Sequence, residues 1–358
     1  MSFLNTIITG TGSYIPTQRI DNNRFIRQTF FNKDRSLIES PGEEVVSKFK
    51  HITGIAERRW VEEDQNCSQI AALASEKAIQ SAGIDPETID QIIVAHNFGD
   101  VIDGTIQTDM VPALAARVKH LLKIKNPHCV AYDLIFGCPG WLQGIIHADA
   151  FIRTGMARRC LVIGAETLSR VVDKYDRDTM IFSDGAGATI LEGIEGPDKK
   201  GILSSAAVTH TEEEVSYLYL GASYHPESDS KIRYIKMDGR KVYEYAISQV
   251  PAAMKEALDK SGVDGKDIKK VLIHQANEKM DEAIIKRFYR LLGIRPDIND
   301  VMPMNIRELG NSSVATIPTL YDMILNDKIP SHKIQEGDLL LFASVGAGMN
   351  INAIIYKQ

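Results

Sequence analysis

The stretch DLIFGCPGW, residues 133–141, places a cysteine, Cys138, between an apolar run and the start of a predicted helix. The first N–H groups of a helix are unpaired and carry a positive partial charge, which favours a thiolate over a thiol and lowers the pKa of a cysteine. A thiolate is a good nucleophile near neutral pH. The position of Cys138 therefore predicts a covalent nucleophile.

The other three cysteines lie in apolar surroundings, so we expect Cys67, Cys129 and Cys160 to be small buried side chains without a chemical role. No pair of cysteines has the CxxC spacing of a zinc site or a redox pair. We expect all four to be reduced thiols of a cytoplasmic protein.

Two pairs of segments resemble each other across the chain. Residues 78–96 (AIQSAGIDPETIDQIIVAH) match residues 257–274 (ALDKSGVDGKDIKKVLIH), and the segment from Gly137 matches the segment from Gly310. Two matches in the same order indicate an internal duplication. Because predicted helices alternate with buried strands, the fold class is α/β, with one half over residues 1–190 and the other over residues 191–358.

This pairing sets Cys138 opposite Asn311 and Ala95 opposite His274. A pseudo-twofold arrangement of the two halves then predicts that Cys138, His274 and Asn311 converge on one centre. His274 ends a predicted strand, where active-site groups of α/β proteins are common, although a structural role is the more frequent one for a single histidine. Asn311 has a second possible role as the N-cap of the following helix, and that alternative stays open.

The motifs around these residues resemble those of the β-ketoacyl-(acyl carrier protein) synthase III group of the thiolase superfamily. The resemblance runs nearly end to end through GTGSYIP, ITGIAERRW, the cysteine turn, DRDTMIFSDGAGATIL, HQAN and GNSS. It implies a thiolase-like duplicated α/β unit in five αβαβα layers, usually as a homodimer. A thiolase would carry a second cysteine in the final segment FASVGAGMN, and long-chain condensing enzymes use two histidines, so both are disfavoured.

The resemblance also implies a reaction. Cys138 would take an acyl group from a thioester, and His274 and Asn311 would promote decarboxylation of malonyl-acyl carrier protein and stabilise the enolate. Attack of the enolate on the acyl-cysteine gives a 3-oxoacyl thioester and carbon dioxide, in fatty acid or related biosynthesis. Backbone N–H groups of Cys138 and Ala347 would form the oxyanion hole. No metal or other cofactor is implied, because the substrates are coenzyme A or phosphopantetheine thioesters.

The sequence departs from the family at the expected substrate contacts. Arg177 matches a coenzyme A contact, but Lys48 and Ile52 stand where a tryptophan and an arginine usually hold the adenine, and a charged insertion over residues 25–46 precedes them. A carrier-bound or unusual acyl donor is therefore favoured, with adenine held by other residues as the alternative. Val111 replaces a bulky aromatic that limits acyl length, which predicts room for a longer or branched group.

A basic helix follows HQAN. By resemblance, Lys279, Lys286 and Arg287 match positions that dock the acyl carrier protein, and carrier proteins are acidic. Lys279 and Lys286 also recur at helical spacing with Arg290. The alternative is an ordinary solvated face, since acidic residues are interleaved with the basic ones.

The charge and the apolar tracts of the whole chain argue against a nucleic-acid-binding or membrane-spanning protein. The 358 residues carry a net charge of −6, which gives no general attraction to nucleic acid or to an anionic membrane, and the apolar tracts are typical of strands rather than of a membrane span. Three alternatives to the condensing enzyme stay open: an acyltransferase that passes the acyl group to oxygen or nitrogen, a cysteine hydrolase, and a non-catalytic acyl-binding protein. The combination of Cys138, His274 and Asn311 favours condensation.

Overall fold

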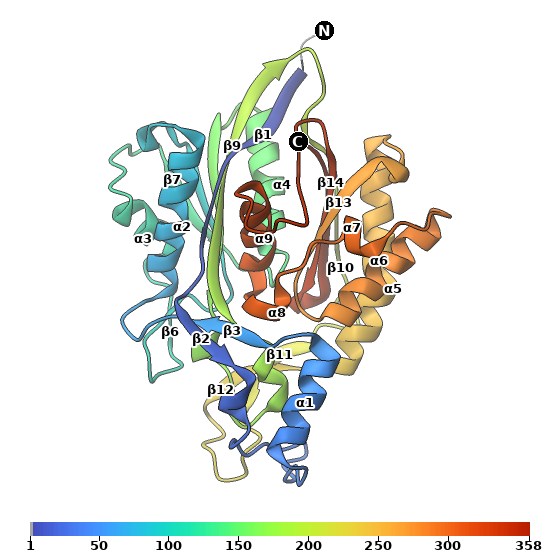
Figure 1. The fold of residues 1–358 in the computed structure, drawn as a ribbon. Coiled ribbons are helices and arrows are strands. Elements are labelled where there is room, and N and C mark those ends of the chain that lie inside the picture. Colours follow the sequence, from blue (N-terminus) through green and yellow to red (C-terminus); the bar gives the residue numbers. More distant parts are fainter. Residues whose placement is uncertain (1–2) are drawn as a thin grey trace.

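Two mixed β-sheets form the centre of the protein in the computed structural model, which describes residues 3–358 (Figure 1). The first sheet has the strand order β1-β9-β8-β4-β7 and the second has the order β10-β15-β14-β13. The strands of the first sheet are β1 (Phe3–Tyr14), β9 (Asp184–Gly196), β8 (Arg159–Thr167), β4 (Gln91–Ala95) and β7 (Val130–Leu134). Those of the second are β10 (Gly201–Thr209), β15 (Asn350–Lys357), β14 (Leu339–Gly346) and β13 (Ile268–Ile273).

The two sheets repeat one pairing pattern. In each, the first two strand pairs are antiparallel and the third is parallel, from β1 to β4 in the first sheet and from β10 to β13 in the second. This repetition confirms the duplicated α/β unit expected from the sequence. The first sheet continues to Gly196 and the second begins at Gly201. A division of the chain near residue 190 stays a prediction.

Helices complete five layers (Figure 1). One pair covers the outer face of the first sheet, a second pair lies between the sheets, and a third covers the outer face of the second sheet. In that order the pairs are α2 (Cys67–Ala82) with α3 (Leu114–Leu121), α4 (Gly140–Arg153) with α9 (Thr316–Leu325), and α5 (Gly239–Ser261) with α6 (Glu278–Leu291). The αβαβα order predicted from the family resemblance is therefore confirmed.

The ends of the outer helices follow from local sequence. Asn66 and Gln69 form a reciprocal capping box at the start of α2, which satisfies N–H groups that a helix leaves unpaired. Gly83 ends α2 and Gly262 ends α5, both with positive φ (64° and 73°), a conformation that glycine adopts without steric cost. These two glycines occupy equivalent positions in the sequence repeat, so the two equivalent helices end in the same conformation.

The central helices are apolar on most sides because both of their neighbours are sheets. Trp141 and Ile145 of α4 pack with Leu320 and Tyr321 of α9 and with Phe342 of β14, all almost fully buried. Each such side chain contributes about 1.5–3 kcal/mol through burial. This core fixes the start of α4 against the second sheet, which matters because Cys138 lies just before that helix.

A smaller lobe caps one end of the two sheets (Figure 1). It combines α1, the β2–β3 pair and the β11–β12 hairpin around a separate apolar cluster. The elements are α1 (Gly42–Thr53), β2 (Gln18–Asp21), β3 (Glu57–Trp60), β11 (Leu218–Ala222) and β12 (Arg233–Met237); shorter pieces elsewhere are β5 (Asp100–Val101), β6 (Thr108–Asp109), α7 (Ile298–Val301) and α8 (Ile306–Leu309). No helix within residues 3–358 is long and apolar enough to cross a bilayer.

Candidate active site

A cavity of about 280 Å³ lies where the two sheets meet the smaller lobe. Cys138, His274 and Asn311 all line it, together with Ala347. The rest of the wall is mostly apolar and includes Leu218 and other side chains of the β11–β12 hairpin. The structure thus brings together the three residues that sequence symmetry pointed to; their catalytic roles stay predictions until they are tested.

Cys138 follows β7 and precedes the first residue of α4, Gly140. Gly137 adopts φ 68°, and a Cβ there would lie 2.7 Å from the backbone nitrogen of Ala347. A Cβ on Gly346 would likewise lie 2.4 Å from the nitrogen of Cys138. Both glycines are therefore required by the close approach of the two backbone segments. That approach puts the backbones of Cys138 and Ala347 in the same wall of the cavity, and the oxyanion hole expected from their N–H groups stays a prediction.

The thiol of Cys138 is partly shielded from bulk water inside this cavity. Burial raises the pKa of Cys138 to about 11, while a hydrogen bond from Ser313 opposes the rise. The expectation that the helix start lowers this pKa below its ordinary value is wrong, because desolvation of the sulfur raises the pKa more. The other three cysteines are buried and free, as expected.

His274 follows β13, and its backbone nitrogen donates to the carbonyl of Ala343 in β14. The ring is almost fully buried, and its Nδ1 lies 2.7 Å from Oγ1 of Thr316. Burial lowers the pKa of His274 to about 4, so the imidazole is neutral at physiological pH. With Nδ1 engaged, Nε2 is the ring nitrogen left for a substrate.

Asn311 is held by backbone pairing with the segment before β9. Its N–H donates to the carbonyl of Ile181 and its carbonyl accepts from the N–H of Ser183, both at 2.9 Å. Its Oδ1 accepts from the N–H of Ser313 at 2.7 Å, a local turn contact related to the capping role expected for this residue. The side-chain oxygen is used in this turn, and the Nδ2 donor is left for the cavity.

Four polar residues beside these groups were not singled out from the sequence. Ser313 donates to the sulfur of Cys138, and Asn97 contacts both Ser313 and the buried Glu166. Thr316 contacts His274. Asn97 lies two residues after Ala95, the repeat partner of His274, and Ser313 lies in the GNSS motif. The sequence therefore offered a reason to consider both residues as part of the site. Glu166 had no sequence signal, because its contacts are made only in the fold.

A second cavity, of about 420 Å³, adjoins the first and shares Ile181, Met237, Val242, Ala276 and Met280 with it. Arg177, Lys48 and Ile52 line this outer cavity, as do Ile38 and Ser40 of the insertion. The positions where the sequence departs from its family therefore gather at the mouth of the reactive cavity. Arg177 lines the outer cavity, and its role as a substrate contact stays a prediction.

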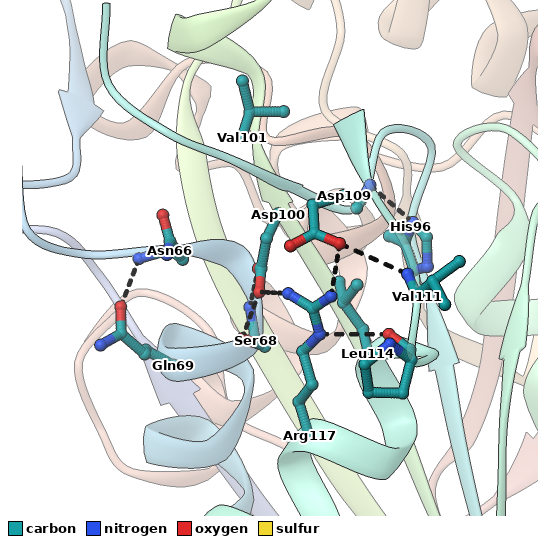
Figure 2. Close-up of polar contacts among 12 residues, drawn as sticks. Asn66, Ser68, Gln69, His96, Asp100, Val101, Asp109, Val111, Leu114 and Arg117 are labelled. Atoms are coloured by element: carbon teal, nitrogen blue, oxygen red, sulfur yellow. Dashed lines mark hydrogen bonds and ion pairs between the residues drawn. The ribbon is translucent and has the colours of Figure 1, made fainter. Parts of the chain in front are cut away.

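Val111 lies elsewhere. Its side chain is 88% exposed and lines neither cavity within this one chain. Arg117 holds the loop that bears Val111 (Figure 2). It donates to Asp100 at 2.8 Å, to Asp109 at 2.6 Å and to the carbonyl of Pro112 at 3.1 Å. A role of Val111 in the acyl pocket stays a prediction.

The basic residues after HQAN lie on α6, a helix that contributes Met280 to the outer cavity. Lys279, Lys286, Arg287 and Arg290 are all exposed, while the opposite face of the helix is buried. Lys286 pairs with Glu282 at 2.5 Å, and Nζ of Lys279 lies 3.1 Å from His51 of α1.

Within residues 3–358, no three His, Cys, Asp or Glu side chains are grouped as a metal site.

Comparison with known proteins agrees with this architecture. The family profile described as 3-oxoacyl-[acyl-carrier-protein] synthase III matches residues 132–211, and the profile of its C-terminal part matches residues 258–358. The chain is 32% identical, over 99% of both sequences, to the β-ketoacyl-[acyl-carrier-protein] synthase III of Erythrobacter litoralis.

Solved structures give the same picture. The 3-oxoacyl-[acyl-carrier-protein] synthase III of Aquifex aeolicus superposes with a TM-score of 0.78 and 29% identity, covering 99% of this chain and 100% of the other. The β-ketoacyl-[acyl carrier protein] synthase III of Thermus thermophilus gives 0.79 and 28%, with coverage of 98% and 99%. The chain that joins Cys138, His274 and Asn311 in one cavity belongs to the 3-oxoacyl-[acyl-carrier-protein] synthase III family.

Proposed function

We propose that this protein is a transferase that condenses an acyl group, carried on Cys138, with malonyl-acyl carrier protein. The observation that carries the proposal is the shared cavity of Cys138, His274 and Asn311, with the backbone of Ala347 in the same wall. Family membership supports the reaction class, and the finer assignment to a 3-oxoacyl-acyl carrier protein synthase III activity within the acyltransferases is part of the proposal.

The first half-reaction is acyl transfer. Sγ of Cys138 attacks the thioester carbonyl carbon, the backbone N–H groups of Cys138 and Ala347 stabilise the oxyanion, and the donor thiol leaves with the proton that Cys138 loses. Removing a preorganised donor of this kind commonly costs about 3 kcal/mol of transition-state stabilisation. The apolar wall formed by β11 and β12 receives the acyl chain.

The second half-reaction is decarboxylative condensation. The bond from the malonyl carbon to its carboxylate breaks, carbon dioxide leaves, and an enolate forms at a thioester oxygen that His274 and Asn311 contact. The enolate carbon then bonds to the acyl carbon, and Cys138 leaves as a thiolate that takes a proton from solvent. Burial of His274 and Asn311 strengthens their contacts with the developing charge, because little water competes.

Four further assignments belong to this proposal. The acyl carrier protein docks on α6 through Lys279, Lys286 and Arg287, whose exposed charges complement an acidic partner.

The protein acts as a homodimer, supported by the free edge of β7, which carries the exposed Val130, and by the exposed Val111 nearby in the chain. It needs no metal or cofactor beyond its thioester substrates, and it works in the cytoplasm.

The residues that line the outer cavity suit some acyl donors better than others. Lys48 and Arg177 offer positive charge for a phosphate, but Ile52 supplies no guanidinium and α1 offers no tryptophan to the outer cavity. We therefore favour a carrier-bound acyl donor, with acyl-coenzyme A as the alternative.

The experiment that tests the proposal is intact-protein mass spectrometry after incubation with a panel of acyl-coenzyme A and acyl-carrier donors. The expected result is an acyl adduct that is absent from Cys138→Ala, is retained in Cys129→Ala, and is discharged by malonyl carrier protein with release of carbon dioxide. An adduct that malonyl carrier protein leaves in place would favour the alternative, transfer to an oxygen or nitrogen nucleophile. An adduct that persists in Cys138→Ala would refute the assigned nucleophile.

A further inference from the structure

Ser313 contributes a hydroxyl to the reactive cavity that neither half-reaction described above uses. Its Oγ lies 3.3 Å from Sγ of Cys138, within hydrogen-bonding range for sulfur, and the residue is only 3% exposed. We infer that Ser313 is a catalytic residue whose O–H donates to the sulfur of Cys138, and that Asn97 and Glu166 are positioning residues that fix the direction of this hydrogen bond. The inference rests on the proposed role of Cys138 as the nucleophile.

The direction of the bond follows from counting hydrogens. The Nδ2 of Asn97 lies 3.1 Å from Oγ of Ser313 and also contacts Oε1 of Glu166. Nδ2 carries two hydrogens and accepts none, so each of these oxygens is an acceptor from Asn97. Oγ of Ser313 accepts from Asn97 and keeps its single proton, which is free to be donated to the sulfur 3.3 Å away.

Glu166 is what keeps Asn97 in this orientation. Oε1 of Glu166 accepts from Nδ2 of Asn97, which keeps the amide nitrogen on the side that also faces Oγ of Ser313. Glu166 is 1% exposed, and burial, with a further contribution from the charge of Asp184, raises its pKa to about 8. A largely neutral Glu166 still accepts from Asn97, and it places little negative charge beside the thiolate that must form on Cys138.

The backbone holds Ser313 in a conformation that serine rarely adopts. Its φ is +52°, in the left-handed region, and its N–H is tied to Oδ1 of Asn311. Such strain persists only where surrounding contacts enforce it, and it is frequent at functional sites. The same turn therefore aims Nδ2 of Asn311 into the cavity and the hydroxyl of Ser313 at the sulfur.

A donor at this position acts whenever the sulfur carries negative charge. That happens before Cys138 attacks the acyl donor and again when it leaves the condensed product. The cavity desolvates the thiolate, so a hydrogen bond from within the protein replaces one that water would give in solution. Ser313 therefore favours formation of the thiolate and its release as a leaving group.

The test is the pH dependence of alkylation of Cys138 by iodoacetamide, followed by mass spectrometry of the peptide that contains it. In Ser313→Ala and Ser313→Gly we expect the pKa of the thiol to rise by about one unit and alkylation near neutral pH to slow roughly tenfold, as expected for loss of one hydrogen bond to a charged group. Ser313→Gly keeps a residue suited to positive φ, so it separates loss of the hydroxyl from backbone strain.

Two further variants sharpen the result. Ser312→Ala is the matched control, because Ser312 is the buried neighbour in the same motif and packs beside Gly185 instead of the sulfur; its alkylation profile should equal that of the wild type. Asn97→Ala should raise the pKa of the thiol in the same direction as Ser313→Ala, which a purely structural role would not do.

An unchanged pKa of the thiol in both Ser313 variants, with thermal melting close to that of the wild type, would overturn the inference. This outcome is distinct from failure of the proposed function. If wild-type Cys138 took no acyl group from any donor, the function would fail whatever the alkylation profiles show, whereas acylation of Cys138 with equal profiles in all variants would refute Ser313 alone.

Discussion

Oγ1 of Thr316 lies 2.7 Å from Nδ1 of His274 and 3.0 Å from the carbonyl oxygen of Ser313. The Thr316 hydroxyl has one proton and can donate it to only one of these two groups. If Thr316 donates to the carbonyl of Ser313, then Nδ1 of His274 must carry the ring hydrogen and donate it to Oγ1. If Thr316 donates to Nδ1 of His274 instead, the ring hydrogen of His274 is on Nε2. Thr316 thus couples the tautomer of His274 to the backbone of the GNSS loop.

Thr316→Val should slow the decarboxylation step about tenfold, which is the order expected for loss of one hydrogen bond that orients His274. Valine matches the shape of threonine but cannot bond to Nδ1, so the tautomer and orientation of His274 are no longer fixed. Single-turnover release of labelled carbon dioxide from malonyl carrier protein, with acylated enzyme, measures this step. Thr319→Val is the control in the same helix, because its hydroxyl makes only a 3.5 Å contact with Ala186. Equal rates for the two variants would contradict the coupling.

The lowered pKa of His274 predicts a pH dependence of stability. Burial holds the folded pKa near 4, whereas the unfolded value is about 6.5. Between these values the unfolded chain binds more protons than the folded chain, so the free energy of unfolding rises with pH through this window and falls as pH drops below about 6.5. The penalty at pH 5 is on the order of 2 kcal/mol.

Urea denaturation of wild type and His274→Gln at pH 7.5 and pH 5 measures this difference. The variant lacks the titrating group, so it should lose less stability than the wild type between the two pH values. The same loss in both proteins would show that the imidazole of His274 is protonated as readily in the folded state as in the unfolded one.

The sequence was sufficient for the features that are repeated or local. Gly83 and Gly262 end equivalent helices, and the equivalence of the two halves was enough to bring Cys138, His274 and Asn311 to one predicted centre. What it could not provide were contacts that depend on the packing of distant segments. Glu166 and Ser313 both contact Asn97, yet Ser313 is 216 residues from Asn97 in sequence and no periodicity links them.

The pKa of Cys138 shows the same limit. A helix start near the cysteine can be read from the sequence, but the enclosure of the sulfur cannot, and enclosure decides the sign of the shift. The resemblance placed Lys48, Ile52 and Arg177 at one substrate contact, and the structure puts all three in the outer cavity; that Ile38 and Ser40 of the insertion also line this cavity had no sequence signal.

Reversing charge on α6 should separate carrier-bound from small substrates. The double variant Lys286→Glu with Arg287→Glu places two acidic side chains on an exposed face, and repulsion of an acidic carrier should raise KM for malonyl carrier protein about tenfold, mainly through slower association. Steady-state kinetics with malonyl carrier protein and with a short malonyl thioester mimic give the comparison, and the mimic should be unaffected. Lys260→Glu on α5 is the control, as it reverses an exposed charge on a different helix. Equal losses for carrier and mimic would argue against docking on α6.

Lys236 connects the hairpin that walls the cavity to the segment before β9, and its removal should destabilise the protein in a pH-dependent way. Its Nζ is fully buried, 2.6 Å from Asp173 and 3.0 Å from Asp176. Burial already raises the pKa of Asp176 to about 6, and Lys236 opposes that rise. Lys236→Met leaves two buried carboxyl groups without their cation, which commonly costs about 3–5 kcal/mol.

The sign of the pH effect distinguishes this cause from a simple packing defect. Without Lys236 the pKa of Asp176 rises further above its unfolded value, so the folded state binds the additional proton and the variant loses stability as pH increases. Denaturation of Lys236→Met should therefore show a larger deficit at pH 8 than at pH 5.5, while Lys260→Met, which removes an exposed lysine, should match the wild type at both. A deficit equal at the two pH values would mean that the lost contacts, rather than the unpaired carboxyl groups, set the stability of the hairpin.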